Sequence, residues 1–409
     1  MQKKNCRMCR SNKLHMFLDL GFTALADGFI TREQLNEPEK QYPLRVCVCR
    51  ECGLFQLDHV VPPDELYRKN YPYLSSVTKT GREHFHGMAT SICKKYGIGR
   101  DKLAIDVGSN IGVLLEGFKS NGLRVLGIDP ADNIVEMANK RGIETWPEYF
   151  NGNIATKVLK EKGRASVITG TNVFAHIDDL DDMMDAVSKI LEDDGIFVFE
   201  LPYLVDLLDN LEYDTIYHEH LSYISIKPLV KFFRKFKMEL FDVERTGIHG
   251  GSIRVFVCKK GKHKIQKAVD ELVNLEDDKK VYDLKRLEKF SRDVQKQKED
   301  LIDLLRSIKK QGKRIVGLSA PAKGNTLLNY CKIGTDYLDY VTEKAETKIG
   351  LYTPGTHIEV KDDASIIRDR PGYALLLAWN FAPEIIKNME EFRKNGGKFI
   401  IPIPAPKVV

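Results

Sequence analysis

The segment "YHEHLSY", from Tyr217 to Tyr223, gathers several side chains that can transfer protons. A histidine titrates near neutral pH, so His220 is a candidate general base, and the neighbouring carboxyl of Glu219 can orient it and stabilise its cation. The phenol of Tyr217 can donate a hydrogen bond to a developing oxyanion. We therefore expect proton transfer by His220, with Glu219 and Tyr217 as its partners.

The residues of this segment allow two further interpretations, a metal site and a packed loop. An HExxH zinc protease would need a histidine where the chain has Ser222, so that motif is excluded. His218 and His220 could share a metal if the segment is extended, but no further ligand set of clear spacing is visible. The polar residues could also only pack a loop against a sheet, because crowding in the sequence does not show that side chains converge.

Four cysteines near the start form two C-x2-C pairs, Cys6 with Cys9 and Cys49 with Cys52. Two such pairs supply the four thiolates of a closed tetrahedral zinc site, which leaves no position for water and is therefore structural. The sequence "CVCREC" also offers Cys47 as a substitute ligand, and the alternative is a set of reduced thiols without metal. We expect Zn²⁺ to stabilise a region too poor in apolar residues to fold alone.

A glycine loop follows the first predicted strand of the central region, in "LAIDVGSNIGVLLEGF". Gly108 and Gly112 let the backbone approach a ligand closely, where a helix N-terminus presents free amides. Asp106 ends the strand before the loop, and Asp129 ends the next strand, where it can accept hydrogen bonds from ribose hydroxyls. The loop lacks the full G-x-G-x-x-G fingerprint, and instead resembles that of class I methyltransferases, which bind S-adenosylmethionine.

Asn172 and His176 lie in "TNVFAHIDD", directly after the predicted strand "ASVITG". In an open α/β sheet the carboxyl ends of the strands border the ligand crevice, so both side chains can face a ligand. We assign Asn172 to the cofactor and His176 to the active site. The alternative for His176 is a buried histidine satisfied by a backbone carbonyl.

The elements that must position these side chains alternate along the chain. From Lys102, the β-rich runs "LAIDVG", "LRVLGID", "ASVITGTNVF" and "GIFVFELP" each precede a periodic segment, which is typical of a doubly wound parallel sheet. The segments "GREHFHGMATSICKKYGI" and "KPLVKFFRKF" predict helices, and "MELFDVERT" and "GSIRVFVCKK" predict antiparallel strands. Long charged helices follow, and then a second α/β region with "RIVGLSA", "YLDYVTE" and "YALLLAW" as strands. The first 75 residues are expected to be irregular.

Composition narrows the class of protein. At 409 residues the chain is too long for one ordinary core. The net charge of +5, from 63 basic and 58 acidic residues, gives little support to nucleic-acid binding. The chain has no apolar run of membrane-spanning length, and its start lacks the apolar core of a signal peptide. We expect a cytoplasmic protein that binds neither membranes nor nucleic acid.

The combined motifs resemble those of the sugar C-methyltransferases of deoxysugar pathways over nearly the whole chain. The resemblance rests on the two cysteine pairs, "IDVGSNIGVLL", "NVFAHIDD", "YHEHLSYIS", "GIHGGSIRVFV" and "LSAPAKGNTLLNY". Those enzymes methylate C3 of nucleotide-linked 4-keto-6-deoxy sugars, usually dTDP sugars. The resemblance implies a zinc-binding domain at 1–75, a central Rossmann-like methyltransferase domain at 76–260 that binds S-adenosylmethionine, and a helical connector with a C-terminal Rossmann-like α/β domain at 261–409 that helps hold the nucleotide sugar.

The resemblance also assigns roles to residues. It implies that Cys6, Cys9, Cys49 and Cys52 bind zinc, that His220 is the base beside Glu219 and Tyr217, and that His176 and Tyr71 of "YPYLSS" are further active-site positions. The glycine loop departs from the family's "E-I-G-x-N-D-G", because Ile111 replaces the second acid. Since the glycines and Asn110 remain, cofactor binding is expected to survive.

The substrate is expected to contact the C-terminal region. The sequence "GLSAPAKGNTLLNY" predicts a strand, a turn and a helix start suited to phosphate or nucleotide, with Lys323 and Asn325 as candidates beside His249. A purely structural turn is the alternative, because the P-loop ending is missing.

Together these features predict an S-adenosylmethionine-dependent C-methyltransferase of a nucleotide-bound keto sugar. A base removes the acidic proton next to a ketone, and the resulting enolate attacks the methyl group in line. The alternatives are a sugar O-methyltransferase of the same architecture, a non-catalytic scaffold that binds zinc and nucleotide, and a nucleic-acid methyltransferase.

Overall fold

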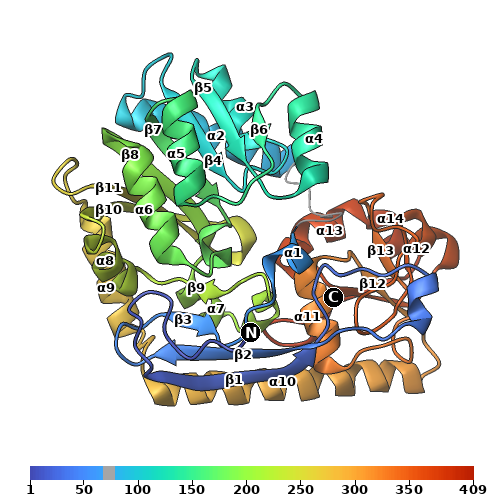
Figure 1. Cartoon of the computed structure of the whole chain (residues 1–409). Coiled ribbons are helices and arrows are strands. Elements are labelled where there is room, and N and C mark those ends of the chain that lie inside the picture. Colours follow the sequence, from blue (N-terminus) through green and yellow to red (C-terminus); the bar gives the residue numbers. More distant parts are fainter. Residues whose placement is uncertain (68–78) are drawn as a thin grey trace.

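The computed structural model describes residues 1–67 and 79–409, and three β-sheets organise it (Figure 1). Tyr71 lies outside the described residues. In Figure 1 the central sheet lies above the N-terminal strands, and the C-terminal domain lies to their right. The largest buried apolar cluster contains residues of all three regions, such as Leu18, Phe197 and Leu301. The three regions therefore share one continuous core.

The N-terminal sheet has four strands in the order β1-β2-β3-β9. The expectation of irregular structure before residue 75 is wrong for three segments, β1 (Leu14–Thr23), β2 (Tyr42–Cys49) and β3 (Phe55–Leu57), in which apolar side chains fill one buried face. The fourth strand, β9 (Ser222–Tyr223), comes from the histidine-rich segment and pairs Tyr223 with Phe55. This region also contains the short helices η1 (Glu33–Asn36) and α1 (Pro63–Leu66).

The central sheet has seven strands in the order β10-β11-β8-β7-β4-β5-β6. Its strands are β4 (Leu103–Val107), β5 (Arg124–Ile128), β6 (Thr145–Trp146), β7 (Ala165–Thr171), β8 (Leu191–Pro202), β10 (Met238–Thr246) and β11 (Ser252–Lys259). The first five pair in parallel and the last two are antiparallel, which confirms the predicted doubly wound sheet. Because β4 lies between β5 and β7, the strand order reverses at β4, where α/β sheets bind ligands.

Helices cover the central sheet and connect it to the remaining chain. They are α2 (Lys79–Tyr96), α3 (Val113–Ser120), α4 (Asp132–Lys140), α5 (Gly152–Glu161), α6 (Leu180–Ile190), α7 (Leu204–Asp209) and α8 (Ile226–Arg234), with the short turns η2 (Phe174–His176), η3 (Tyr213–Thr215) and η4 (Ile248–Gly250). The predictions of α2 and α8 are confirmed.

The C-terminal sheet has six strands in the order β14-β13-β12-β15-β16-β17. They are β12 (Ile315–Leu318), β13 (Val341–Glu343), β14 (Val360–Asp362), β15 (Tyr373–Leu376), β16 (Lys398–Ile401) and β17 (Lys407–Val408). All pair in parallel except β17, as expected for a Rossmann-like domain. Its helices are α11 (Ala322–Cys331), α12 (Ala364–Asp369), α13 (Ala382–Asn388) and α14 (Glu390–Lys394), with η5 (Trp379–Phe381) after β15.

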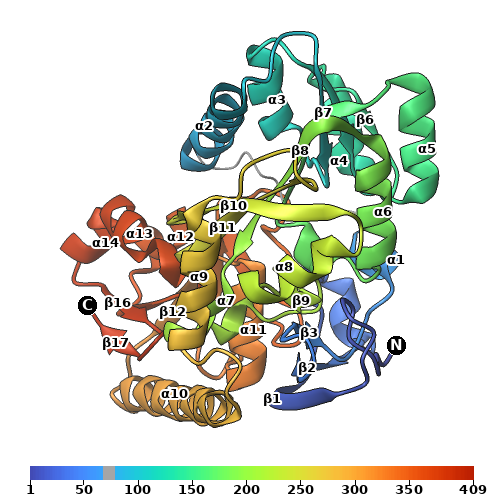
Figure 2. The ribbon, with the colours of Figure 1, turned by 90° about the vertical axis from the view of Figure 1, so that its left-hand side faces the viewer.

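Two connecting helices, α9 (Lys267–Asp278) and α10 (Leu284–Lys310), confirm the predicted helical segment. The buried side chains of α10 recur at helical spacing from Leu287 to Ile308, so one face of this helix is apolar. Figures 1 and 2 show α10 running along β1 and below the C-terminal domain, and it contacts both β1 and α11. In the described ranges, no helix combines the length and the apolar character that crossing a membrane requires.

Candidate active site

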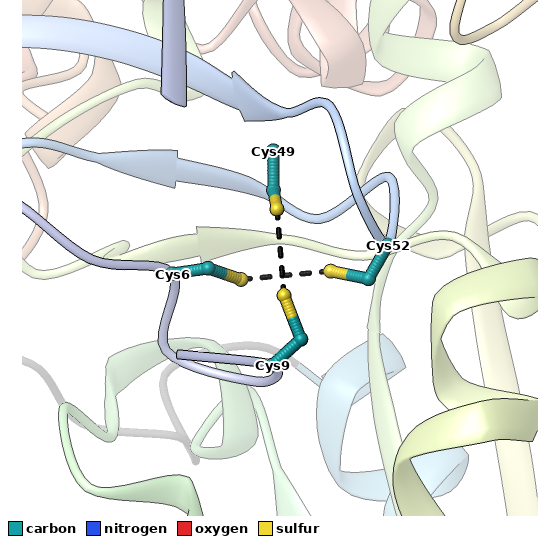
Figure 3. A group of neighbouring side chains, drawn as sticks. All are labelled: Cys6, Cys9, Cys49 and Cys52. Carbon is teal, nitrogen blue, oxygen red and sulfur yellow. Dashed lines mark hydrogen bonds between the residues drawn. The ribbon is translucent and has the colours of Figure 1, made fainter. Parts of the chain in front are cut away.

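The predicted zinc ligands converge (Figure 3). The four Sγ atoms of Cys6, Cys9, Cys49 and Cys52 all lie within 4.8 Å of one another, and the closest pairs are 3.5 Å apart. A Zn–S bond of about 2.3 Å requires tetrahedral S–S separations of about 3.8 Å, so the thiols fit zinc. Cys47 is not a member of this group. In residues 1–67 and 79–409, the four cysteines are the only group of three or more His, Cys, Asp or Glu side chains placed to hold a metal ion. His218 and His220 therefore do not belong to a metal site within these residues.

The glycine loop after β4 has the backbone conformation that its sequence requires. Gly108, Asn110 and Gly112 have φ angles of 64°, 50° and 81°, which are left-handed. A Cβ atom at Gly108 would lie 2.4 Å from Cγ2 of Val173, and one at Gly112 would lie 2.7 Å from Cγ2 of Ile143. Both glycines are therefore needed for the loop to lie this close to its neighbours.

Asp129 directly follows β5 and is hydrogen-bonded to this loop. Its Oδ2 accepts a hydrogen bond from the backbone N–H of Asn110 at 2.9 Å, and its Oδ1 accepts one from Ala131 at 3.0 Å. Burial raises the pKa of the Asp129 carboxyl, and the two backbone donors oppose this shift. Each carboxyl oxygen of Asp129 keeps a second lone pair, so it can still accept a hydrogen bond from a ribose hydroxyl.

Asp106 lies at the base of the same loop, within β4. Its Oδ1 accepts a hydrogen bond from Oγ1 of Thr169 in β7 at 2.6 Å. Burial raises the pKa of Asp106 to about 7. This carboxyl therefore connects two strands below the glycine loop.

His220 has a defined tautomer. Its Nδ1 lies 2.7 Å from the backbone carbonyl of Thr215, and because a carbonyl only accepts, Nδ1 carries the proton. Nε2 is then the basic nitrogen of the neutral ring. The ring centroid lies 3.9 Å from that of Tyr217 and 5.1 Å from that of His176. The structure thus brings together three of the predicted catalytic residues.

His176 has the properties of a neutral hydrogen-bond donor. Burial, followed by the nearby charge of His220, lowers its pKa well below the usual range for histidine. Its ring lies 5.9 Å from that of Tyr67 at an interplanar angle of 14°. Within the part of the chain that the structure describes, Nε2 of His176 is buried without a hydrogen-bond partner. A ligand oxygen can therefore bind there.

Glu219 is buried, with 3% of its surface exposed. Burial, and then the charge of Asp27, raise the pKa of Glu219 to about 8, so this carboxyl is neutral at pH 7. The acceptor that orients Nδ1 of His220 is the Thr215 carbonyl, a backbone atom that no sequence pattern singles out. His218, in contrast, packs at 5.8 Å from the ring of Tyr42, and burial lowers its pKa to about 4. We interpret His218 as structural.

A small cavity adjoins His220. It is lined by Asn172, Ala175, Leu201, Pro202, Leu204, Leu207, Thr215, His220, Ser222 and Tyr223. Asn172 follows β7 with a φ of 57°, and its backbone N–H donates to the carbonyl of Glu200 at 2.7 Å. Among the described residues, the hydroxyls of Ser222 and Tyr223 are buried without partners. Both belong to the segment "YHEHLSY", but sequence reasoning assigned no role to either hydroxyl, because the sequence does not show which side chains of that segment face the cavity.

The predicted substrate contacts in the C-terminal domain lie beside the turn that precedes His220. Nζ of Lys323 lies 4.1 Å from the ring centroid of Trp379 and 3.8 Å from Oδ2 of Asp214. Burial lowers the pKa of Lys323. Asn325 is buried, and its Nδ2 donates to the carbonyl of Ala26 at 2.6 Å. The backbone of His249 lies in η4, between β10 and β11.

Three family models match successive parts of the chain. They are a zinc binding domain over residues 6–67, a methyltransferase domain over 88–241 and a C-methyltransferase C-terminal domain over 247–404. The ubiquinone biosynthesis O-methyltransferase of Colwellia psychrerythraea is 25% identical over 182 residues, which cover 42% of this chain and 71% of that protein. A crystal structure of an S-adenosylmethionine-dependent methyltransferase from Clostridium acetobutylicum aligns with a TM-score of 0.36 and 15% identity, over 44% of this chain and 92% of that one.

A further relative matches along nearly the full length. The C-methyltransferase NovU of Streptomyces niveus is 36% identical over 405 residues, which cover 99% of this chain and 96% of NovU. The predicted enzyme class, the cofactor S-adenosylmethionine and the zinc-binding domain are thereby confirmed. The chain therefore belongs to the C-methyltransferase family of NovU, the family that its motifs resemble, and is an S-adenosylmethionine-dependent methyltransferase.

Proposed function

We propose that this C-methyltransferase methylates C3 of a nucleotide-linked 4-keto-6-deoxy sugar, with dTDP as the nucleotide and His220 as the base. The observation that carries the proposal is the hydrogen bond from Nδ1 of His220 to the Thr215 carbonyl. In the neutral ring this bond leaves Nε2 as the basic nitrogen, beside a neutral His176 whose own Nε2 lacks a partner in the described chain. A base and a neutral donor at one site suit the formation of an enolate.

In the proposed reaction, Nε2 of His220 takes the proton from the carbon next to the ketone. The electron pair of the broken C–H bond forms the C=C bond of the enolate, and the carbonyl π electrons move onto oxygen. Nε2 of His176 donates to that oxygen, as does Tyr217 or the neutral Glu219. S-adenosylmethionine supplies an electrophilic methyl group when bound. The enolate carbon would attack that methyl group: the methyl–sulfur bond would break with its electron pair passing to sulfur, S-adenosylhomocysteine would leave, and the ketone would re-form. His220 would hold the proton that left the sugar.

We propose the following roles for the remaining predicted residues. The cofactor is held by the central domain through the glycine loop, Asp106, Asp129 and Asn172. The nucleotide sugar is held by residues 261–409 through Lys323 and Asn325, together with His249 and Tyr71. The short distance between Nζ of Lys323 and Oδ2 of Asp214, 3.8 Å, supports this division, because it places a C-terminal candidate beside the turn that leads to His220.

Mass spectrometry in deuterated water tests the function. The reaction contains the enzyme, S-adenosylmethionine and a dTDP-4-keto-6-deoxy sugar, and compares the wild type with His220→Ala. We expect the sugar to gain one methyl group, and the C3 proton to exchange with solvent when the cofactor is omitted. The variant should lose both. Retention of exchange in the variant would exclude His220 as the base.

A second substrate separates C-methylation from O-methylation. A dTDP sugar with a hydroxyl in place of the 4-keto group cannot form the enolate. Methyl transfer to this compound would contradict the proposal and favour a sugar O-methyltransferase. If the protein binds S-adenosylmethionine and the dTDP sugars tightly but methylates neither sugar, a non-catalytic scaffold would be favoured.

A further inference from the structure

The carbonyl that orients His220 belongs to a buried turn, η3. Tyr213 and Asp214 in this turn are 0% exposed, and Thr215 is 9% exposed. The side-chain hydroxyl and the backbone N–H of Thr215 both donate to the carbonyl of Glu212, at 2.7 Å and 3.1 Å. The direction of the Thr215 carbonyl, and with it the orientation of the His220 ring, therefore depends on how this turn is held.

Two adjacent residues attach the turn to the C-terminal domain. The hydroxyl of Tyr213 donates to Oε1 of Gln297 in α10 at 2.5 Å. On the other side, Oδ2 of Asp214 accepts a hydrogen bond from Nε1 of Trp379 in η5 at 2.6 Å, and it lies 3.8 Å from Nζ of Lys323 in α11. Three separate elements, α10, η5 and α11, thus hold this turn.

Two contacts of Oδ2 fix the position of the Asp214 side chain. A buried carboxylate is costly unless hydrogen bonds or charges compensate it. Trp379 can only donate through Nε1, so its bond to Asp214 has one direction. The ammonium of Lys323, which lies over the same indole ring, adds a compensating charge. A carboxylate held by these two groups restricts the backbone of the residue that follows it, Thr215.

We propose that Asp214, held by Trp379, is a positioning residue that fixes the Thr215 carbonyl and, through it, the imidazole of His220. The proposal rests on the proposed function in one respect, namely that His220 is the base. It makes the C-terminal domain part of the catalytic apparatus, although the proton acceptor belongs to another part of the chain.

Two variants interrupt the contact from opposite sides. Trp379→Phe removes the Nε1 donor and keeps an aromatic ring beneath Lys323, and Asp214→Ala removes the carboxylate. Asp209→Ala, the same substitution on α7 at a carboxylate paired with Lys279 and Arg286, is the matched control. The rate of deuterium exchange at C3 of the dTDP-4-keto sugar is measured without S-adenosylmethionine, over a range of substrate concentrations.

We expect the maximal exchange rate to fall about 10-fold or more in both variants, because small displacements of a catalytic group cost this much. KM should change little in Trp379→Phe, which keeps Asp214 and an aromatic ring beside Lys323, whereas Asp214→Ala also removes the carboxylate beside Lys323 and should raise KM in addition. The control should behave as the wild type. The double variant should be no worse than Asp214→Ala alone, since both changes break the same bond. Wild-type rates in both variants, or a rise in KM alone, would overturn the proposal and assign the pair to structure or substrate binding.

A spectroscopic measurement tests the positioning without any substrate. In protein labelled with ¹⁵N-histidine, the Nδ1–H signal of His220 is identified by its loss in His220→Gln. We expect this signal in the wild type and the control, and its loss or displacement in Trp379→Phe and Asp214→Ala. An unchanged signal would refute the proposal.

This second measurement also separates the two proposals. If the wild type does not exchange the C3 proton, the proposed function fails, while the imidazole signal still decides whether Asp214 positions His220. If Asp214→Ala does not bind zinc and S-adenosylmethionine as the wild type does, Trp379→Phe alone decides the outcome.

Discussion

The imidazole rings of His220 and His176 lie 5.1 Å apart at an interplanar angle of 42°. One ring has its basic nitrogen defined by the Thr215 carbonyl, and the other is kept neutral by burial and by the charge of the first. Two neighbouring imidazoles, of which one offers a basic nitrogen and the other stays a neutral hydrogen-bond donor, can act as base and as donor in the same reaction.

His220→Gln is expected to lower kcat by about 100-fold to 10,000-fold, the range that general-base catalysis supplies. Glutamine keeps a donor for the Thr215 carbonyl but has no basic nitrogen. Affinity for S-adenosylmethionine, measured by isothermal titration calorimetry, should be unchanged. A kcat near that of the wild type would show that another group takes the proton.

His176→Phe is expected to reduce kcat about 10-fold to 1,000-fold, because a neutral donor to the developing oxyanion is lost. His176→Gln retains an N–H donor and should keep more activity. Since His176 is uncharged near neutral pH, the acidic limb of the rate profile should stay in place in the Gln variant. A displaced limb in steady-state assays between pH 5 and 9 would mean that His176 is charged.

Glu219 should make stability depend on pH. Its pKa is raised to about 8 in the folded chain, so between the ordinary pKa of glutamate and pH 8 the unfolded state ionises while the folded state does not. Folding therefore becomes less favourable as pH rises through this window. Between pH 5.5 and 8, the Tm measured by scanning calorimetry should fall less in Glu219→Gln than in the wild type. If the Tm of the two proteins falls in parallel with pH, Glu219 is not a buried neutral acid.

Gly108→Ala should weaken S-adenosylmethionine binding about 10-fold or more, because the new Cβ would overlap Val173 and displace the loop that approaches the ligand. Gly97→Ala is the matched control, since Gly97 has a φ of 63° against 64° for Gly108 but nothing within 4 Å of its Cβ. Calorimetric titration should show normal affinity in the control. Equal losses in both variants would mean that backbone strain, rather than the overlap, is responsible.

Removal of zinc should reduce turnover although a site of four thiolates leaves the metal no open position. The cysteine site holds the sheet to which β9 belongs, and β9 begins two residues after His220. Cys49→Ser should lose bound zinc, measured by elemental analysis, together with most activity. Cys47→Ser should retain both, because Cys47 lies outside the group. Full activity in a zinc-free protein would show that the site around His220 does not depend on the cysteine site.

Local patterns in the sequence were sufficient for several features. The C-x2-C pairs predicted the zinc group, because four thiolates at this spacing have few other uses. Apolar runs alternating with helical segments predicted both α/β sheets, and the Gly108 to Asp129 spacing predicted which loop faces the acid of the next strand. Motif resemblance led to the family. These inferences succeed because spacing along one element, or across one strand–helix–strand unit, is fixed by backbone geometry.

The remaining features depended on contacts between distant segments. The sequence contains no sign that Ser222 and Tyr223 complete the zinc domain's sheet, because a two-residue strand has no periodicity. It also does not show that Thr215 orients His220, since every residue carries a carbonyl. The neutral states of His176 and Glu219 follow from burial, which only the packed chain creates. Residue types thus determined which chemistry was available, and tertiary structure decided which groups meet and how each is protonated.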